Sequence, residues 1–259
     1  MKGKTAIVTG STSGIGHGIA TAFAAEGCNI LLNGFGPAAE IEQIRADLAE
    51  NYGVKVGYSP ADMSKPADIR AMVALAASEL GGVDILVNNA GIQFTAPVDE
   101  FPEDKWDAII AINLSAAFHA SKAAIPLMKK GGWGRIINIA SAHGLVGSEH
   151  KVAYVAAKHG IVGMTKVTAL ENANAGITVN AICPGWVLTP LVQKQIEDRA
   201  KQNGTSVEQE KIALLSEKQP MHSFVTPAQL GALAVFLCSD NGATITGTAQ
   251  SMDGGWVAQ

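Results

Sequence analysis

Short runs of apolar and β-branched residues recur along the chain, and longer segments with helically spaced apolar positions separate them. Strands that read as nearly continuous hydrophobic runs are typical of a parallel sheet covered by helices on both faces. The pattern therefore predicts an α/β fold, in which a single doubly wound (Rossmann-type) parallel sheet has seven strands. The expected strands are residues 5–9, 29–32, 55–58, 85–88, 135–139, 178–182 and 249–252, and the expected helices are residues 15–25, 39–52, 66–80, 103–128, 153–172 and 227–239.

One segment interrupts this alternation, between the sixth expected strand and the last expected helix. Ten of the 25 residues from 194 to 218 are charged, against 16% of the whole chain. A solvated surface excursion would have this composition, but long excursions at the carboxyl ends of parallel strands often cover ligands. No Pro-, Gly- or Ser-rich linker divides the chain. We therefore expect one domain over residues 1–259, with a small helical substrate lid at about 187–222.

Composition and charge narrow the classes of function. With 47% apolar residues the chain can build a large core, which excludes a disordered protein. The 19 basic and 23 acidic side chains give a net charge of −4. This balance argues against a nucleic-acid partner, because phosphates require a clustered basic face. The low charged content suggests that some neutral surface is buried between subunits, so we expect a homo-oligomer.

Cysteines and uncharged stretches indicate the compartment. Cys28, Cys183 and Cys238 are far apart and odd in number, so we expect neither a disulfide framework nor a metal site, and a reducing cytoplasm fits best. Residues 5–25 and 172–193 are uncharged, but they contain too many Gly, Ser, Asn and Pro residues for a membrane span or a secretory signal. We expect no membrane partner.

A glycine-rich turn follows the first expected strand and leads into a helix. It contains Gly10, Gly14 and Gly16. Glycines at such a turn let backbone N–H groups and the helix N-terminus approach a pyrophosphate. A turn of this kind can also be a packing device, but its position between a strand and a helix favours a dinucleotide site.

A second group of residues has the chemistry of proton transfer. Tyr154 and Lys158 are four residues apart, so they share one face of a helix. A positive charge beside a phenol favours the phenolate and lowers its pKa, which starts near 10. A lone Tyr–Lys pair is weak evidence, and a surface pair is the simpler interpretation. Ser141 at the end of a strand and Asn113 in a helical segment give the pair its weight, although each could also be satisfied locally.

These motifs, in this order, resemble the short-chain dehydrogenase/reductase family over essentially the whole chain. The glycine spacing is Gly-x-x-x-Gly-x-Gly, and Asn-Asn-Ala-Gly follows the fourth expected strand. The resemblance implies an oxidoreductase in which Tyr154 exchanges the proton of the substrate hydroxyl while hydride passes to or from a nicotinamide. It also implies that Ser141 orients the reacting oxygen, that Lys158 grips the ribose, and that Asn113 kinks its helix and holds a water.

The same resemblance implies a set of cofactor contacts. Asp62 would bind the adenine, and Pro184, Gly185 and Thr189 would clamp the carboxamide. The full set of implied contacts is Gly10, Thr12, Gly14, Ile15, Gly16, Phe35, Asp62, Asn89, Gly91, Tyr154, Lys158, Pro184, Gly185, Val187 and Thr189.

The cofactor prediction depends on the end of the second expected strand. NAD enzymes of the family commonly place an Asp there, whereas this chain has Asn33, Gly34 and Phe35. The 2′-phosphate of NADP would require a cation at this position, and none is present. We therefore expect NAD, with Phe35 as an apolar wall beside the adenosine.

Four polar residues adjoin the segments that should face the nicotinamide. They are Gln93, His143, Lys151 and Gln195. Each alone is more simply a surface or loop residue. Together they supply one cation and several donors near the hydride site, an arrangement suited to a small carboxylate substrate.

The segments around these residues closely resemble one group within the family, the bacterial D-3-hydroxybutyrate dehydrogenases. The resemblance implies that Gln93, His143, Lys151 and Gln195 bind the substrate carboxylate. It also implies that the reaction is oxidation of (R)-3-hydroxybutyrate. Substrate contacts would then come from Gln93, Ser141, His143, Lys151, Tyr154, Trp186, Gln195 and Trp256, with the two tryptophans as apolar walls at the acyl end.

Other functions stay open at this point. A 3-oxoacyl reductase or a sugar-alcohol dehydrogenase has the same fold, although the sequence shows no basic cofactor pocket or carrier-docking patch. A non-catalytic dinucleotide sensor would lack the Ser, Tyr or Lys that this chain retains. The family resemblance also implies a homotetramer, built through the two long helices after residues 103 and 153 and the C-terminal region.

Overall fold

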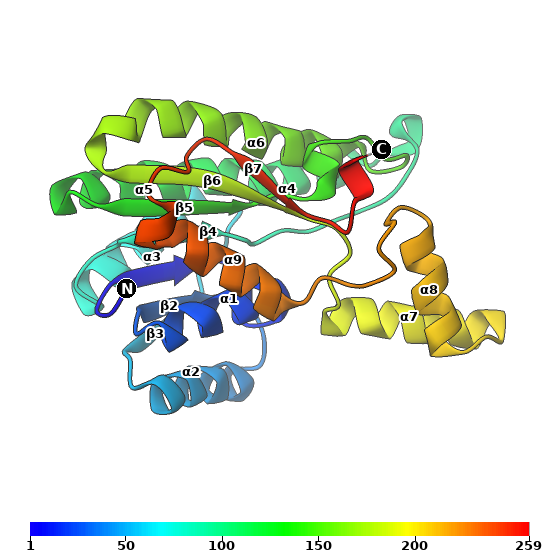
Figure 1. The fold of residues 1–259 in the computed structure, drawn as a ribbon, viewed down its shortest axis with the longest axis horizontal. Helices are drawn as coiled ribbons and strands as arrows, with labels where there is room; N and C mark the ends of the chain where they lie inside the picture. Colours follow the sequence, from blue (N-terminus) through cyan, green and yellow to red (C-terminus); the bar gives the residue numbers. More distant parts are fainter. Residues whose placement is uncertain (259) are drawn as a thin grey trace.

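Seven strands form a single sheet in the computed structural model, which describes residues 1–258, for residue 191 the backbone only (Figure 1). Their order is β3-β2-β1-β4-β5-β6-β7, and every neighbouring pair is parallel. This confirms the predicted doubly wound fold. The strands are β1 (Thr5–Val8), β2 (Asn29–Asn33), β3 (Val56–Ser59), β4 (Ile85–Asn88), β5 (Gly134–Ile139), β6 (Ile177–Pro184) and β7 (Ala249–Met252).

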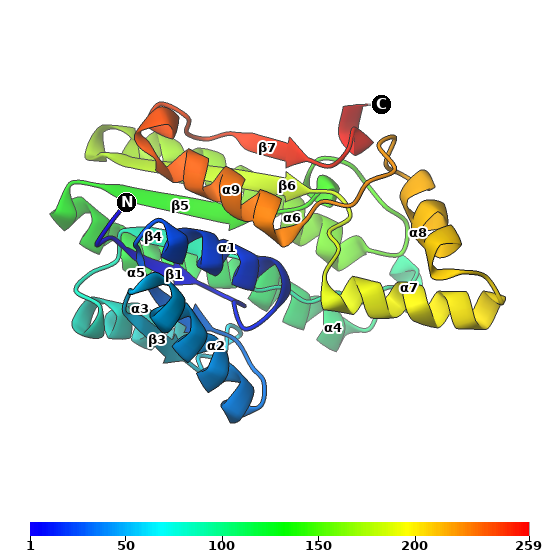
Figure 2. The same ribbon diagram turned by 60° about the horizontal axis from the view of Figure 1, so that its bottom comes forward.

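Helices cover both faces of the sheet, because alternate strand residues point to opposite sides (Figure 2). Ala6 and Val8 of β1 pack with α1 and α9, whereas Ile7 between them packs with α3 and α5. Both faces of the central strands are therefore apolar. The covering helices are α1 (Gly14–Ala25), α2 (Ala38–Tyr52) and α9 (Pro227–Cys238) on one face, and α3 (Pro66–Glu79), α5 (Ala116–Gly131) and α6 (Val152–Asn172) on the other.

One expected helix is interrupted. Residues 103–128 were expected to form a continuous helix, but the structure has α4 (Glu103–Ile110), a π-helical turn (Ala111–Ser115) and then α5. Such turns insert an extra residue and are frequent at functional sites. The buried side chain of Asn113 lies in this turn. Short 3₁₀ turns occupy Val98–Glu100, Ala142–Gly144, Ala173–Ala175, Asp240–Gly242 and Trp256–Ala258.

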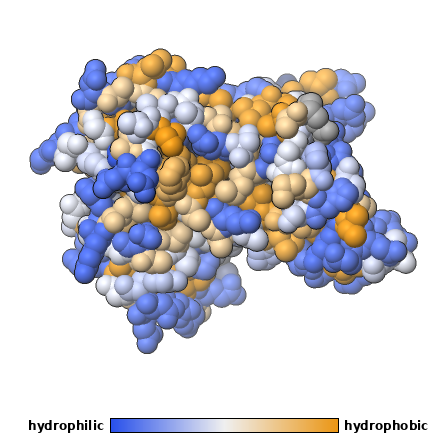
Figure 3. Space-filling view, in the orientation of Figure 1, coloured by the Kyte–Doolittle hydropathy of each residue, from blue (hydrophilic) through white to orange (hydrophobic). Residues whose placement is uncertain are grey.

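Two helices leave the body of the protein after β6. They are α7 (Pro190–Asn203) and α8 (Val207–Ser216), and we call residues 190–216 the two-helix excursion. Figure 1 shows it projecting beyond the carboxyl ends of the strands, and Figure 3 shows its surface as largely hydrophilic. Arg199 of α7 pairs with Glu210 (3.3 Å) and Glu217 (3.6 Å), which join the two helices into one unit.

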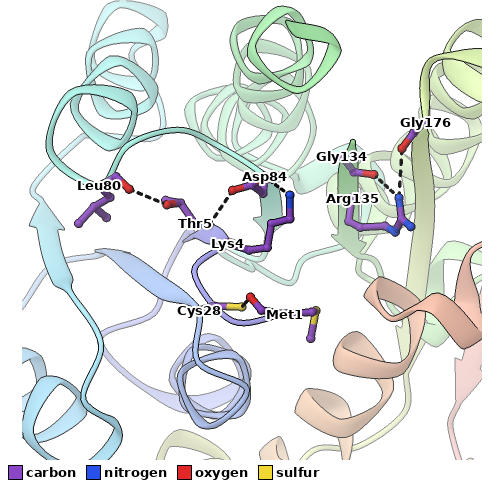
Figure 4. A network of polar contacts seen from close by, with 9 residues as sticks. All are labelled: Met1, Lys4, Thr5, Cys28, Leu80, Asp84, Gly134, Arg135 and Gly176. Atoms are coloured by element: carbon purple, nitrogen blue, oxygen red, sulfur yellow. Dashed lines mark hydrogen bonds and ion pairs between the residues drawn. The ribbon is translucent and has the colours of Figure 1, made fainter. Parts of the chain in front are cut away.

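A network of polar contacts ties the opposite, amino edge of the sheet together (Figure 4). The carboxylate of Asp84 accepts hydrogen bonds from Lys4 Nζ at 2.9 Å and from the backbone N–H of Thr5 at 2.8 Å. Lys4 Nζ and the Arg135 guanidinium lie 4.5 Å and 4.3 Å from the ring centroid of Trp133. These contacts join β1 to its neighbours at the edge of the sheet opposite the carboxyl ends of the strands.

The composite helix Glu103–Gly131 is, among the described residues, the one helix long and apolar enough to cross a membrane by length and composition. Ala120, Ala124 and Met128 on its inner face are buried against the sheet. The core helix of an α/β sandwich has this composition as well. Trp106 and Phe118, by contrast, are exposed on its outer face.

Candidate active site

The loops that follow β4, β5 and β6 meet at the carboxyl edge of the sheet and enclose a cavity of about 820 Å³. Ligands of open α/β sheets bind at this edge, because all the parallel strands end there. The structure brings most of the predicted site residues together in this one cavity. Its lining includes Ile15, Asn89, Gly91, Gln93, Ser141, His143, Lys151, Tyr154, Lys158, Pro184, Gly185, Trp186, Val187, Thr189, Gln195 and Trp256.

The lining also contains residues that the sequence analysis missed. Phe94 and Thr95 extend the loop that carries Gln93, and Val192 precedes Gln195 on α7. The sequence feature that could have identified them is their position close to predicted site residues. Ile92, Ile139 and Ala140 complete the set of missed residues.

The glycine-rich turn is held by the side chain of Asn33 at the end of β2. Its Oδ1 accepts the N–H of Gly10 at 3.2 Å, and its Nδ2 donates to the carbonyls of Ser59 (3.1 Å) and Ala61 (3.0 Å). At Gly16 a Cβ would collide with the carbonyl of Gly10, so this position requires glycine. Asn33 is therefore committed to the protein backbone and cannot serve as a ligand group.

The turn leaves the start of α1 open for an anion. Ser13 precedes α1 without a side-chain capping bond, so the first amides of the helix have no partner from it. Thr12 donates its hydroxyl to the carbonyl of Phe35 at 3.1 Å, and the side chain of Phe35 is 70% exposed. The Thr189 side chain approaches Gly14. These features fit the pyrophosphate and adenosine of a dinucleotide.

Asp62 lies after β3, outside the cavity. Its carboxylate accepts bonds from the N–H (2.9 Å) and hydroxyl (2.7 Å) of Ser64 and pairs with Lys65 at 3.4 Å. The bonds from Ser64 are the main reason that the pKa of Asp62 is lowered. The predicted adenine contact of Asp62 stays a prediction.

The Asn113 side chain holds the loop after β4. Its Oδ1 accepts the N–H of Ile92 and its Nδ2 donates to the Ile92 carbonyl, both at 2.9 Å. These two hydrogen bonds to one residue fix the backbone from which Gln93 extends. A separate cavity of about 10 Å³ lies between Asn88, Asn113 and Lys158, about the minimum volume for one water. The water implied for Asn113 stays a prediction that this cavity supports.

Lys158 and Tyr154 lie side by side on α6. Lys158 is buried, donates from Nζ to the carbonyl of Ile139 at 2.7 Å, and lies 5.5 Å from the centroid of the Tyr154 ring. Burial lowers the pKa of Lys158 to about 8, so its ammonium form predominates at neutral pH.

The pKa of Tyr154 corrects one expectation. Lys158 was expected to lower it, but in the structure the pKa of Tyr154 is raised. Burial penalises the phenolate more than the hydrogen bond with Ser141 favours it. The protein alone therefore keeps Tyr154 as a neutral phenol.

An aromatic group surrounds His143 beside Tyr154. The His143 ring makes edge-on contacts with Tyr154 (centroids 6.0 Å apart) and Trp256 (5.0 Å), and Lys151 Nζ lies 6.0 Å from the centroid of Trp186. His143 Nε2 and Trp186 Nε1 are buried without a hydrogen-bond partner in the described part of the chain. Buried polar atoms usually have partners, so these two atoms point to a polar ligand.

Burial, together with nearby positive charge, keeps His143 neutral. Its pKa is lowered to about 4, first by burial and then by the charges of Lys151 and Lys218. His143 is therefore neutral at physiological pH, and Lys151 supplies the cation of this part of the cavity. Burial and Lys218 also lower the pKa of Lys151, whereas Glu217 raises it.

Comparison with known proteins shows the family of the chain. The family model described as enoyl-(acyl carrier protein) reductase matches residues 10–257. The chain belongs to the short-chain dehydrogenase/reductase family and is an oxidoreductase with a dinucleotide-binding fold.

Two relatives share nearly its full length. A D-β-hydroxybutyrate dehydrogenase of Cupriavidus necator is 62% identical and covers 100% of both chains. A D-β-hydroxybutyrate dehydrogenase of Rhizobium meliloti is 56% identical and covers 99% of both. Among solved structures, the L-sorbose reductase of Gluconobacter frateurii, complexed with NADPH and L-sorbose, is 32% identical. Its TM-score is 0.95, over 100% of this chain and 98% of that one.

The charge of Lys151 gives the first testable prediction. In the variant Lys151→Gln the pKa of His143 should rise, because a neighbouring positive charge is removed, yet stay below 6.5, because burial is the larger cause. An NMR titration of the imidazole measures this, and Lys130→Gln on the exposed surface of α5 serves as the control. An unchanged or lower pKa would contradict the assignment.

The titration of His143 also makes the free energy of unfolding depend on pH. Because the folded-state pKa of His143 lies below its ordinary value of 6.5, the unfolded chain binds this proton first as the pH falls. His143 should therefore reduce the free energy of unfolding between about pH 6.5 and 4, and the loss should be smaller in Lys151→Gln.

Proposed function

We propose that the protein oxidises (R)-3-hydroxybutyrate to acetoacetate with NAD as the hydride acceptor, and that it catalyses the reverse reduction. One observation carries this proposal. A single cavity combines a group for proton transfer, Tyr154 with Ser141, and a group for binding a carboxylate, Lys151 with His143. The full-length likeness to two proteins named D-β-hydroxybutyrate dehydrogenase supports the choice of substrate.

The dinucleotide would lie along the carboxyl edge of the sheet. The open start of α1 would bind its pyrophosphate, and Asn89, Lys158 and Thr189 would hold its nicotinamide half. A nicotinamide held there would supply the hydride acceptor for the carbinol carbon.

Tyr154 and Ser141 would handle the other hydrogen. In oxidation the substrate O–H proton passes to the Tyr154 oxygen as the C–H electron pair leaves as hydride, and a C=O bond forms. Ser141 holds the reacting oxygen in place. Because burial raises the pKa of Tyr154, its resting phenol suits the reduction, in which it donates a proton. Oxidation first requires loss of that proton, so its rate should increase with pH.

Lys151 and His143 would position the substrate through its carboxylate. Charge-assisted bonds to a carboxylate are stronger than neutral ones. The unpartnered Nε2 of His143 and the neighbouring Gln93 and Gln195 supply further polar contacts. Trp186 and Trp256, with ring centroids 6.3 Å apart, would bound the methyl end.

NAD is the better match for the adenosine end. The turn residues Gly10–Gly14 and the stretch Asn33–Gly36 contain no basic side chain. A 2′-phosphate there would lack a cation. The L-sorbose reductase structure contains NADPH, so the cofactor preference is a property to test in this chain itself.

A sugar substrate is the second candidate, since the L-sorbose reductase has the same fold. A polyol offers no anion to Lys151, so it would gain no charge-assisted bond from the partly buried ammonium. We therefore favour the hydroxy acid.

We further propose that the protein is a cytoplasmic homotetramer with a mobile two-helix excursion as its substrate lid. Phe118 on α5, and Val167 and Leu170 on α6, are exposed apolar side chains suited to contact between copies. Cys28, Cys183 and Cys238 are free thiols, as in a reducing compartment. Sedimentation measurement of the mass tests the assembly.

Two substitutions separate the proposed roles. Tyr154→Phe should lower kcat by about 10²–10⁴ with little change in dinucleotide binding, because it removes only the hydroxyl that exchanges the substrate proton. Lys151→Gln should raise the KM for (R)-3-hydroxybutyrate at least about tenfold with a smaller effect on kcat. NADH formation measures both.

Lys166→Gln, at an exposed lysine on α6, is the control for Lys151→Gln and should behave as the unaltered protein. Full activity in Tyr154→Phe would contradict the proton-transfer role. Unchanged KM in Lys151→Gln would contradict the carboxylate contact.

The cofactor preference has its own test. Phe35→Arg places a guanidinium at an exposed position whose backbone is fixed by Thr12, so the KM for NADP should fall by at least about tenfold. The KM for NAD should change little, and Phe35→Leu is the matched control. If the unaltered enzyme used NADP as well as NAD, the assignment would be wrong.

A further inference from the structure

Gln219 is a buried polar side chain that lies behind the cavity and touches three chain segments. It follows α8, and 1% of it is exposed. Its Oε1 accepts the backbone N–H of Trp186 at 3.2 Å, and its Nε2 donates to the carbonyls of Met221 and Ser223. Both of its amide hydrogens are thus used, in a place where an unpaired amide would be costly.

Two glycines allow the backbone to approach this side chain closely. A Cβ at Gly185 would lie 2.6 Å from Gln219 Oε1, and a Cβ at Gly254 would lie 2.5 Å from Gln219 Cγ. Trp186 follows the first glycine directly, and Trp256 comes two residues after the second. The two segments that carry the tryptophan walls therefore both pack against one amide.

The backbone of Gln219 is joined to the two-helix excursion. The N–H of Gln219 donates to the carbonyl of Leu215 on α8 at 2.8 Å. The N–H of Met221 donates to the carbonyl of Gly254 at 2.9 Å, and that of Val225 to the carbonyl of Trp186 at 2.9 Å. The end of α8 is thus bonded to both tryptophan segments through Gln219 and the residues just after it.

We propose that Gln219 is a positioning residue that sets the separation of Trp186 and Trp256 and so limits the length of the acyl chain the cavity admits. The proposal rests on the proposed function, because it takes the two tryptophans as the methyl end of the substrate site. It identifies the preferred substrates as short 3-hydroxy acids. Gln219 would set this selectivity through the positions of Trp186 and Trp256, without touching the substrate itself.

The test compares chain lengths in Gln219→Met, which keeps the side-chain length and removes all three side-chain hydrogen bonds. The readouts are kcat and KM for (R)-3-hydroxybutyrate and (R)-3-hydroxyhexanoate, together with the Kd for NADH. We expect the preference in kcat/KM for the shorter acid to fall at least about tenfold. The change should arise mainly through KM, with the Kd for NADH little altered.

The control is Gln202→Met on α7, where the glutamine is exposed, and it should keep the preference of the unaltered enzyme. An unchanged preference in Gln219→Met, or an equal loss of kcat for both acids, would overturn the proposal. If the unaltered enzyme oxidises neither acid, the proposed function itself fails, which is a different result.

A measurement on the unaltered protein decides the matter if Gln219→Met does not fold. Hydrogen–deuterium exchange is followed as NAD and acetoacetate, a non-reacting pair, are added together. Peptides covering residues 185–187, 219–223 and 253–256 should gain protection together. Independent responses of these segments would overturn the proposal.

Discussion

A buried lysine held against the end of a strand is the constraint on which the site depends. Removing an ammonium from water costs several kcal/mol, so it persists only where the protein supplies a partner. Here the carbonyl of Ile139 at the end of β5 is that partner, at 2.7 Å from Lys158 Nζ. The contact fixes α6 relative to β5, and with them Tyr154 and Ser141. Burial lowers the pKa of Lys158 only to about 8, so its charge survives at neutral pH.

The two edges of the sheet divide structural and chemical roles. At the amino edge, the carboxylate of Asp84 is bonded to Lys4 and Thr5, so these polar groups stabilise the fold. At the carboxyl edge, side-chain amides hold loops in place. Asn33 binds the glycine-rich turn, and Asn113 binds the backbone N–H and carbonyl of Ile92. These side-chain amides are already hydrogen-bonded to the backbone. The groups available to ligands are therefore those with buried atoms that lack a hydrogen-bond partner, such as His143.

The features that can be predicted from the sequence are those that depend on residues close together in the chain. Strands and helices follow from local apolar patterns, and the glycine-rich turn and the Tyr154–Lys158 pair follow from fixed spacings. The cavity then forms because parallel strands deliver these motifs to one edge. Asn33 shows the limit: the sequence offers an amide where the family often has an acid, but only the structure shows that it binds Gly10 and the end of β3.

Two further properties depend on the three-dimensional surroundings of a residue, which a sequence motif does not show. The pKa of Tyr154 depends on its burial, which outweighs the hydrogen bond with Ser141. Gln219 directly follows the charged segment 194–218, and its proposed role arises from two glycines 69 residues apart in sequence that pack on it. Asn113, in the π-helical turn, similarly bonds a residue distant in sequence, Ile92.

The central claim is that a carboxylate is recognised beside a proton-transferring tyrosine. It is tested most directly by comparing (R)-3-hydroxybutyrate with its methyl ester, with NADH formation measured for both. The account predicts a kcat/KM for the acid at least about tenfold higher, because only the acid can pair with Lys151. Equal values for acid and ester would contradict it.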